Sequence, residues 1–399
     1  MPEGIGYFAQ AYLGREQGPE PFHSFNHPTV ASQLQVTEVV VPKPLSLNRP
    51  LSGLLFRWTG RIDVSVANYT AAAAESPMTI LQRIRVNGTF KGTSLTPIDI
   101  SGATAFVRPR LFGLRGNSCY INGVRQAEPG VPFQQLLANF GNIGTYDIDQ
   151  WYWVPVYPLV GKGRRAMDNT PYLWQPGDWG DTLQIRLTVG DRTSFGTPAG
   201  GTVVNATAFG SGAGQPLVEI YPIYSILGQP FRQGSFRTAC LIQNEQSTTQ
   251  GMTVVSNNVR IMPLQKQITP NIIIKTGRRL TGTSAGVDVF SDLRDVLLNR
   301  TFPQVDNKQI RTVLTNLSVK EFDGLQQNTV MPEGYFQFCF TESQTARTAF
   351  RGDVPTVVGG GSQFELMTDV VEANNDSLVN VVQDQIIADR DDPYWTGTR

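Results

Sequence analysis

Histidine is nearly absent from this chain: its 399 residues include only two, His23 and His27, both in the stretch FHSFNHP. A pair of histidines four residues apart on a helix can bind a metal ion. Pro28 disfavours a helix at this point, and no third ligand lies nearby in the sequence. A Ser-His-Asp or Cys-His site would also depend on one of these two residues. We therefore expect no enzyme activity, no catalytic residues and no metal ion.

Cysteine is also scarce, with three residues: Cys119, Cys240 and Cys339. They are far apart in the sequence and form no CxxC pair, so they do not resemble a zinc or redox motif. An odd number of cysteines argues against a fully disulfide-paired secreted domain. We expect three buried, reduced thiols in a protein that folds inside the cell.

The chain carries no net charge, because 33 Lys and Arg residues balance 33 Asp and Glu residues. Proteins that coat DNA are usually strongly basic, since they must neutralise phosphates. A balanced chain therefore argues against direct, sequence-specific nucleic-acid binding. It also gives no general attraction to an anionic membrane.

Long apolar runs are missing as well. No stretch of about 18 apolar residues occurs, so no membrane-spanning helix is expected. The N-terminal stretch MPEGIGYFAQAYLG has no basic start followed by an apolar segment, and a signal peptide is not expected.

Three stretches have some features of a functional site but fall short of it. Gly161, Lys162 and Gly163 lack the spacer of a phosphate-binding loop, so we interpret them as a surface loop, and no cofactor is expected. Asp147 and Asp149 would suit a glycosidase, although acid pairs near strand starts are common. The tail ADRDDP could bind Ca²⁺, but a solvated charged tail is the better interpretation.

Glycine (39 residues) and proline (26 residues) are plentiful and spread along the chain, which is typical of many short strands joined by turns. The clearest strands are TLQIRLTV and RIDVSV, in which apolar and polar residues alternate. A third, TILQRIRVNGTF, has a candidate turn at Asn87-Gly88. Four further strands are expected in QLQVTEVVV near Val36, NIIIKT near Ile273, GYFQFCF near Phe338 and QFELMTDVV near Leu366.

Two short stretches have helical spacing. VPFQQLLANFG (131–141) places Phe133, Leu136, Leu137 and Phe140 on one face, and DVFSDLRDVLLNR (288–300) repeats the pattern. One helix is therefore predicted in each half of the chain. Because single cores stop growing at roughly 250–300 residues, the length favours two domains.

The order of expected elements gives four segments. The first thirty residues contain aromatic side chains without a period, as in arms that become ordered by contact with neighbours. The join between the two domains is expected near ILGQPFRQGS (226–235). The predicted segments are an N-terminal arm (1–29), a first domain (30–230), a second domain (231–388) and a C-terminal tail (389–399).

The stretch QWYWVPVYPLV (150–160) is apolar on both faces of a strand. Such a strand is typical of a sheet that is covered on both sides. We expect Trp153 to be a packing residue rather than part of a ligand-binding platform. Pro155 and Pro158 are expected at a strand end or at a sheet edge, since proline donates no ladder hydrogen bond.

Three of these stretches, taken in order, resemble a known family. TILQRIRVNGTF (Thr79–Phe90), WYWVPVYPLV (Trp151–Val160) and DTLQIRLTVGDRTSF (Asp181–Phe195) resemble strands in the first barrel of tectivirus-type major capsid proteins. The order and spacing of the stretches agree with that family. The second half of the chain is only generically similar to it.

The resemblance implies an all-β fold: two eight-stranded jelly-roll β-barrels in one chain, each with a short helix in a long loop. It implies a structural major capsid protein whose homotrimers form pseudo-hexagonal capsomers in the icosahedral shell of a bacteriophage with an internal membrane. The implied partners are other copies of the chain, neighbouring trimers, penton and minor capsid proteins, and the internal viral membrane through the N-terminal arm. The implied location is the virion shell, after assembly in the host cytoplasm.

Two other functions stay open at this point. One is a carbohydrate-binding or carbohydrate-active β-sandwich protein of a phage, which would need an acid-lined cleft or an exposed platform of aromatic rings. The other is a minor virion protein, such as a penton or spike, built from the same strands.

Overall fold

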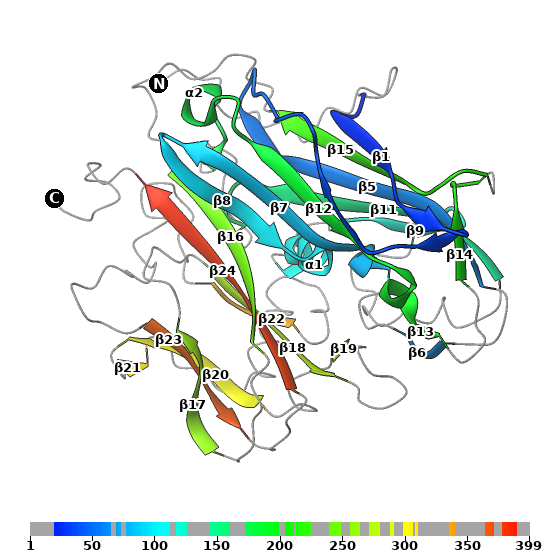
Figure 1. Cartoon of the computed structure of the whole chain (residues 1–399). Coiled ribbons are helices and arrows are strands. Elements are labelled where there is room, and N and C mark those ends of the chain that lie inside the picture. The colour runs from blue at the N-terminus through cyan, green and yellow to red at the C-terminus, as the bar shows by residue number, and fades with distance from the viewer. Residues whose placement is uncertain are drawn as a thin grey trace.

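The computed structural model consists mainly of β-strands (Figure 1). It describes most of the first half of the chain and selected strands of the second half. The described residues are 20–64, 69–72, 77–111, 117–125, 144–159, 172–198, 204–210, 213–224, 239–248, 256–263, 271–279, 288–290, 298–305, 308–309, 335–339, 364–370 and 377–388. Below, "first half" means the described residues between 20 and 224, and "second half" those between 239 and 388.

One sheet has seven strands, all from the first half, in the order β1-β15-β5-β11-β9-β10, with β14 also paired to β5. We call it the first-half sheet. Its strands are β1 (His23–Asn26), β5 (Leu51–Val64), β9 (Cys119–Ile121), β10 (Val124–Arg125), β11 (Gly144–Pro155), β14 (Val204–Thr207) and β15 (Leu217–Tyr224).

A second sheet has nine strands from both halves, in the order β19-β18-β24-β16-β8-β7-β12-β4, with β22 paired to β18. We call it the shared sheet. Its strands are β4 (Thr37–Val40), β7 (Leu81–Phe90), β8 (Thr93–Ile100), β12 (Gln184–Val189), β16 (Ala239–Thr248), β18 (Asn271–Arg279), β19 (Asp288–Phe290), β22 (Tyr335–Cys339) and β24 (Ser377–Ala388).

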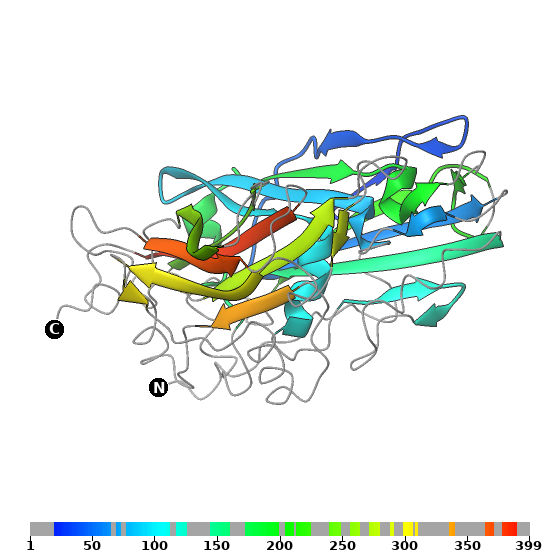
Figure 2. The same ribbon diagram turned by 90° about the horizontal axis from the view of Figure 1, so that it is seen from below.

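The remaining elements are smaller. A four-stranded sheet, in the order β17-β23-β20-β21, belongs to the second half, and two strand pairs, β2 with β3 and β6 with β13, belong to the first. Figure 2 shows the second-half strands gathered toward one end of the molecule. The bounds are β2 (Thr29–Val30), β3 (Gln33–Leu34), β6 (Tyr69–Ala72), β13 (Gly196–Pro198), β17 (Ser256–Pro263), β20 (Leu298–Val305), β21 (Lys308–Gln309), β23 (Phe364–Val370), α1 (Gly102–Leu111), α2 (Pro176–Trp179) and the 3₁₀ turns η1 (Met78–Ile80) and η4 (Arg192–Phe195).

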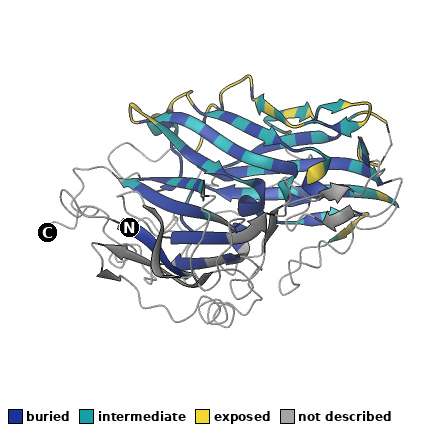
Figure 3. Ribbon diagram, turned by 60° about the horizontal axis from the view of Figure 1, so that its bottom comes forward, coloured by how far each residue is buried: buried dark blue, intermediate teal, exposed yellow. Residues whose placement is uncertain are grey.

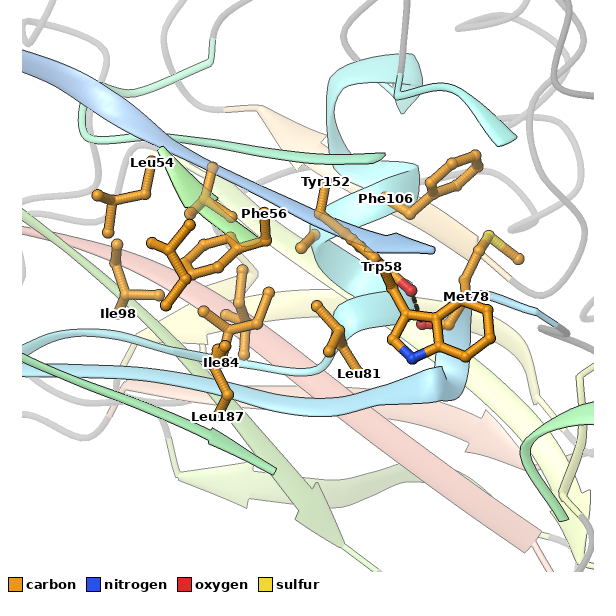
Figure 4. Packing of buried hydrophobic residues seen from close by; sticks show 14 of the residues in the cluster. Leu54, Phe56, Trp58, Met78, Leu81, Ile84, Ile98, Phe106, Tyr152 and Leu187 are labelled. Carbon is orange, nitrogen blue, oxygen red and sulfur yellow. Dashed lines mark hydrogen bonds between the residues drawn. The ribbon is translucent and has the colours of Figure 1, made fainter. Parts of the chain in front are cut away.

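The first-half sheet and the shared sheet face each other across an apolar core. Leu54 and Phe56 of β5 lie over Ile98 of β8 and Ile84 of β7, and the ring of Trp58 lies beside Met78 (Figure 4). In the predicted strand TLQIRLTV, buried and partly buried residues alternate along β12, which confirms its period of two. Figure 3 shows the same alternation along neighbouring strands. The patterned strands therefore form because each has one apolar face to bury.

The predicted turn at Asn87-Gly88 is wrong. Strand β7 continues to Phe90, and the chain turns at Lys91 and Gly92, which have positive φ angles of 46° and 83°. Gly88 has a packing role instead: a Cβ there would lie 2.9 Å from atoms of Trp179. The glycine thus marks a close approach of a buried ring, with an irregularity in the pairing to β8 beside it.

The two predicted helices have different outcomes. The stretch 131–141 lies outside the described residues. The prediction for 288–300 is wrong at both ends, because residues 288–290 belong to β19 and residues 298–300 to β20, while 291–297 are not among the described residues. Short apolar runs with helical spacing also fit strands, and here cross-strand pairing decides the outcome.

The predicted arm, 1–29, needs a correction at its C-terminal end. Residues 23–26 form β1, which pairs antiparallel with β15 at the edge of the first-half sheet. His27, which follows directly, is fully buried. The aromatic residues of this stretch therefore reflect packing against the sheet, since Phe22 and Phe25 contact the core. Residues 1–19 lie outside the described part of the chain, so the prediction for them stays open.

The two halves are in direct contact. Strands β8 and β16 pair in parallel, with Gln243 opposite Ile98 and Asn244 opposite Asp99. The main buried cluster also includes Cys240, Ile273, Tyr335 and Val382 from the second half. The halves are thus joined both by sheet hydrogen bonds and by apolar contacts. The predicted domain boundaries near residue 230 lie outside the described residues.

Strand β11 ends at Pro155, as predicted for a proline that cannot continue a ladder. Trp153 is partly buried, and a Cβ on Gly53 would meet its ring at 2.4 Å, so the ring packs closely on that glycine. This supports the predicted packing role. On the opposite face, Tyr152 and Val154 are buried in the core.

Cys119 and Cys240 are buried and form no disulfide, as expected, while the side chain of Cys339 is not among the described ones. Burial raises the pKa of both described thiols. In the described part of the chain, no helix is long and apolar enough to cross a membrane.

Candidate functional site: the junction of the two halves and the outer faces

His27 occupies a structural position. Its Nδ1 accepts a hydrogen bond from Trp58 Nε1 at 3.0 Å, and its Nε2 lies 3.2 Å from the carbonyl oxygen of Gln35. Burial lowers the pKa of His27 from 6.5 to about 4, so the ring is neutral at physiological pH. Across the described ranges, no group of three or more His, Cys, Asp or Glu residues is placed to hold a metal ion.

Asp147 and Asp149 lie on the outer face of the first-half sheet, where each accepts two hydrogen bonds from an arginine. Arg61 binds Asp147 at 2.8 and 2.9 Å, and Arg57 binds Asp149 at the same two distances. The hydrogen bonds from Arg61 hold the pKa of Asp147 below its usual value. A glycosidase needs one acid that stays protonated, and Asp147 with its lowered pKa does not supply it.

The same outer face carries an aromatic cluster around Arg57. The guanidinium lies 4.6 Å from the ring centre of Trp151 and also binds Glu219 at 3.2 Å. Tyr221 stacks on Trp151 with the ring centres 6.3 Å apart. The tryptophan is therefore held by neighbours on its own sheet and is only partly exposed. This arrangement differs from a row of open rings for a sugar.

The outer face of the shared sheet has a different charge pattern. Arg85 of β7 and Arg186 of β12 are directly opposite each other in the ladder. Asp99 binds Arg85 at 3.2 Å, whereas Glu38 is 3.8 Å from Arg186. Like charges opposite each other destabilise a sheet unless something compensates. Asp99 and Glu38 supply such compensation here.

Helix α1 belongs to the first half, and its start is fixed from both halves. Ser101 precedes the helix and accepts a hydrogen bond from the Thr104 backbone N–H at 3.2 Å, which makes it the N-cap. The backbone N–H of Ser101 donates to Glu245 Oε2, on β16 of the second half, at 2.7 Å. Burial alone would raise the pKa of Glu245, but Lys275 and the bond from Ser101 hold it below its usual value.

Arg108 extends from α1 into the second half and is fully buried. Its guanidinium donates to Gln243 Oε1 on β16 and to Asp384 Oδ2 on β24. Gln243 in turn donates to the carbonyl oxygen of Pro155, at the end of β11, at 2.6 Å. Burial lowers the pKa of Arg108 and raises that of Asp384, and their pairing opposes both shifts.

Two amide side chains of the second half complete this junction. Asn271 of β18 donates to Asp384 Oδ2 at 3.2 Å and to the carbonyl oxygen of Leu159 at 2.9 Å. Gln337 of β22 donates to the carbonyl oxygen of Leu111, the last residue of α1, at 2.6 Å. The helix is thus bonded to the second half at its start, in its middle and at its end. Figure 1 shows α1 beside strands of both halves.

Helix α1 was not predicted from the sequence. Its stretch GATAFVRPRL has Pro109 inside and mixes apolar with charged residues, so it lacks an amphipathic period. The available signal was Ser101 followed three residues later by Thr104, a weak start signal. The interactions that define this helix come from residues more than a hundred positions away.

Comparison with known proteins relates this chain to viral capsid proteins through structure alone. No family model and no curated protein sequence matches it. The major capsid protein of Sulfolobus turreted icosahedral virus, in its crystal structure, has a TM-score of 0.56 at 12% identity, covering 94% of this chain and 97% of that one. In a structure of the whole virus the values are 0.57 and 12%, with 93% and 90% covered. The chain has the double jelly-roll fold.

A third similar structure is the major capsid protein of bacteriophage PM2, with a TM-score of 0.42, 9% identity, and coverage of 92% of this chain and 98% of that one. The structural neighbours are double jelly-roll major capsid proteins. The two halves described above meet at the junction around α1.

Proposed function

We propose that this chain is a major capsid protein whose homotrimers form pseudo-hexagonal capsomers in an icosahedral shell. The observation that carries the proposal is the pair of jelly-roll barrels in one chain, over a length that matches a capsid protein almost from end to end. Three such chains around a three-fold axis present six similar barrels, which is a nearly hexagonal block.

The described residues support a structural role. The titratable residues that the sequence singled out are paired or buried where the structure describes them: Asp147 and Asp149 with arginines, and His27 with Trp58. A shell protein needs a stiff core and contact surfaces rather than a reactive centre. In this proposal the first half forms one barrel and the second half the other. The core that they share resists their separation, because separation would expose buried apolar residues.

The finer parts of the proposal rest on the sequence. The resemblance of Thr79–Phe90 and Trp151–Val160 to tectivirus-type proteins favours a bacteriophage with an internal membrane. A chain without net charge fits a shell that a lipid layer separates from the genome. The proposed partners are neighbouring trimers, penton and minor capsid proteins, and the membrane through residues 1–19. The proposed location is the virion shell, after assembly in the host cytoplasm.

The two other functions have less support. A carbohydrate-binding platform needs open rings, but Arg57 and Tyr221 flank the Trp151 ring. A penton or spike protein would share the strands but occur in far fewer copies. Copy number in purified particles separates a shell protein from a minor one.

Light scattering coupled to size-exclusion chromatography tests the trimer directly. We expect the purified chain to elute as one species with three times the mass of the chain. Assays for glycan binding and reducing-sugar release serve as controls and are expected to be negative. A stable monomer that binds or cleaves a glycan would contradict the proposal.

A further inference from the structure

The junction between the barrels contains an ion pair where apolar side chains would be expected. Arg108 and Asp384 are each 1% exposed and are separated by 276 residues in the sequence. Around them the two barrels meet through apolar residues of the common core, including Ile273, Tyr335 and Val382. A charged pair in such surroundings loses its hydration on both sides.

This pair is a poor source of stability. Desolvation of two ions commonly cancels their attraction, and apolar replacements of similar volume are often as stable or more so. Within the described part of the chain, Arg108 Nε, Asp384 Oδ1 and Asn271 Oδ1 are buried and have no hydrogen-bond partner. The network is therefore incompletely satisfied, and stability alone does not explain it.

The pair can instead restrict how the two barrels are oriented relative to each other. The direct sheet contact between the barrels is short, with two residue pairs between β8 and β16. Burial of apolar surface is non-directional, whereas a planar guanidinium bonded to Gln243 and Asp384 is directional. Because Arg108 is on α1, and α1 is also bonded at both ends by Glu245 and Gln337, the helix can hold one orientation of the second barrel.

We propose that Arg108 and Asp384 are positioning residues that fix the second barrel against the first in the one orientation that a capsomer requires. This inference rests on the proposed function, because capsomers tile only if all six barrels are equivalently oriented. It assigns the buried pair to specificity of assembly rather than to stability of the fold.

The test replaces both charges by apolar side chains of similar size, Arg108→Met together with Asp384→Leu. We expect a melting temperature at or above that of the unaltered chain, but heterogeneous oligomers and a loss of shell assembly in electron micrographs. The single variant Arg108→Met leaves Asp384 buried without its cation and should melt at least about 5 °C lower. Arg108→Lys keeps the charge without the planar fork, and we expect partial recovery of assembly.

Ile273→Val is the matched control, because it weakens the same junction and leaves the network intact. It should lower the melting temperature slightly and assemble normally. The inference is overturned if the double variant assembles like the unaltered chain. It is also overturned if the double variant melts at a much lower temperature than the unaltered chain.

A readout that does not need assembly separates this inference from the proposed function. Spin labels on Val124→Cys in the first barrel and Gln246→Cys in the second report the distance between the barrels. We expect one narrow distance distribution in the unaltered chain and a broad one in the double variant. If the unaltered chain forms no trimers, the proposed function fails. If both distributions are equally narrow, the positioning role fails.

Discussion

At the residue scale, His27 links the segment that follows β1 to Trp58 in the core of the first half. The ring is fully buried and has a hydrogen-bond partner for each nitrogen. Its neutral form fits this site, and protonation would put a charge there that desolvation disfavours. Sequence alone placed this residue in an arm, because nothing local shows that Trp58, 31 residues away, completes its hydrogen bonding.

This site predicts a pH dependence of stability. The pKa of His27 is about 4 in the folded chain against 6.5 as the reference value, so below pH 6.5 the unfolded chain binds more protons. The contribution of neutral His27 to the free energy of unfolding is complete above pH 6.5. It is lost as the pH falls toward 4, and the loss amounts to about 3 kcal/mol. Unfolding in urea at pH 7.5, 6, 5 and 4 measures it.

His27→Gln serves as the test variant, because an amide can accept from Trp58 and donate to Gln35 without titrating in this range. In this variant the free energy of unfolding should change less between pH 6.5 and pH 4 than in the unaltered chain. His23→Gln is the control and should leave the dependence as it is in the unaltered chain. The same slope in His27→Gln and the unaltered chain would show that other groups cause it.

The buried thiols predict chemical inertness. Cys119 and Cys240 are both fully buried, and burial raises the pKa of each, so little thiolate forms. In a Cys339→Ser background, a thiol reagent should not react with the native chain and should modify two thiols after denaturation. Fast modification of either cysteine under native conditions would contradict the described packing.

At the element scale, helix α1 is held on one side by the turn before β7. A Cβ added at Gly102 would lie 2.1 Å from the carbonyl oxygen of Leu81 and 2.9 Å from that of Met78. Only glycine allows the helix to start this close to the backbone of that turn. The position of α1 at the junction therefore depends on this first residue.

Gly102→Ala is expected to destabilise the chain by about 2 kcal/mol, because the clash with backbone atoms outweighs the usual helix preference of alanine. Urea unfolding measures the loss. Gly144→Ala is the matched control, since its nearest neighbour atom is 3.5 Å away, and should be close to neutral. Equal stability of both variants would show that α1 does not sit where the structure places it.

Strands were more predictable than helices for a physical reason. An alternating stretch such as β12 carries its structural signal in its own sequence, because one face must be buried. Helix α1 carries no such signal, because its two ends are bonded to Glu245 and Gln337 of the second half. The apolar spacing at 288–300 fitted a helix, but pairing of β19 with β18 and of β20 with β23 was decisive there.

At the scale of the whole molecule, the order of strands and the resemblance predicted two jelly rolls, and the structure has that fold. The shared sheet and the continuous core were not predictable, because no local pattern shows that β8 pairs with β16 across more than a hundred residues. The hydrogen bonds and ion pair of the junction were unpredictable for the same reason. Each of its polar residues, taken alone in the sequence, looks like an ordinary surface residue.

The central claim is that this chain tiles an icosahedral shell as trimers of two-barrel subunits. Cryo-electron microscopy of particles purified from cells that express the viral locus tests it most directly. The account predicts facets built from pseudo-hexagonal blocks, each fitted by three copies of this chain with the barrels oriented as in the structure. Facets built from a different protein, with this chain absent or confined to the vertices, would contradict it.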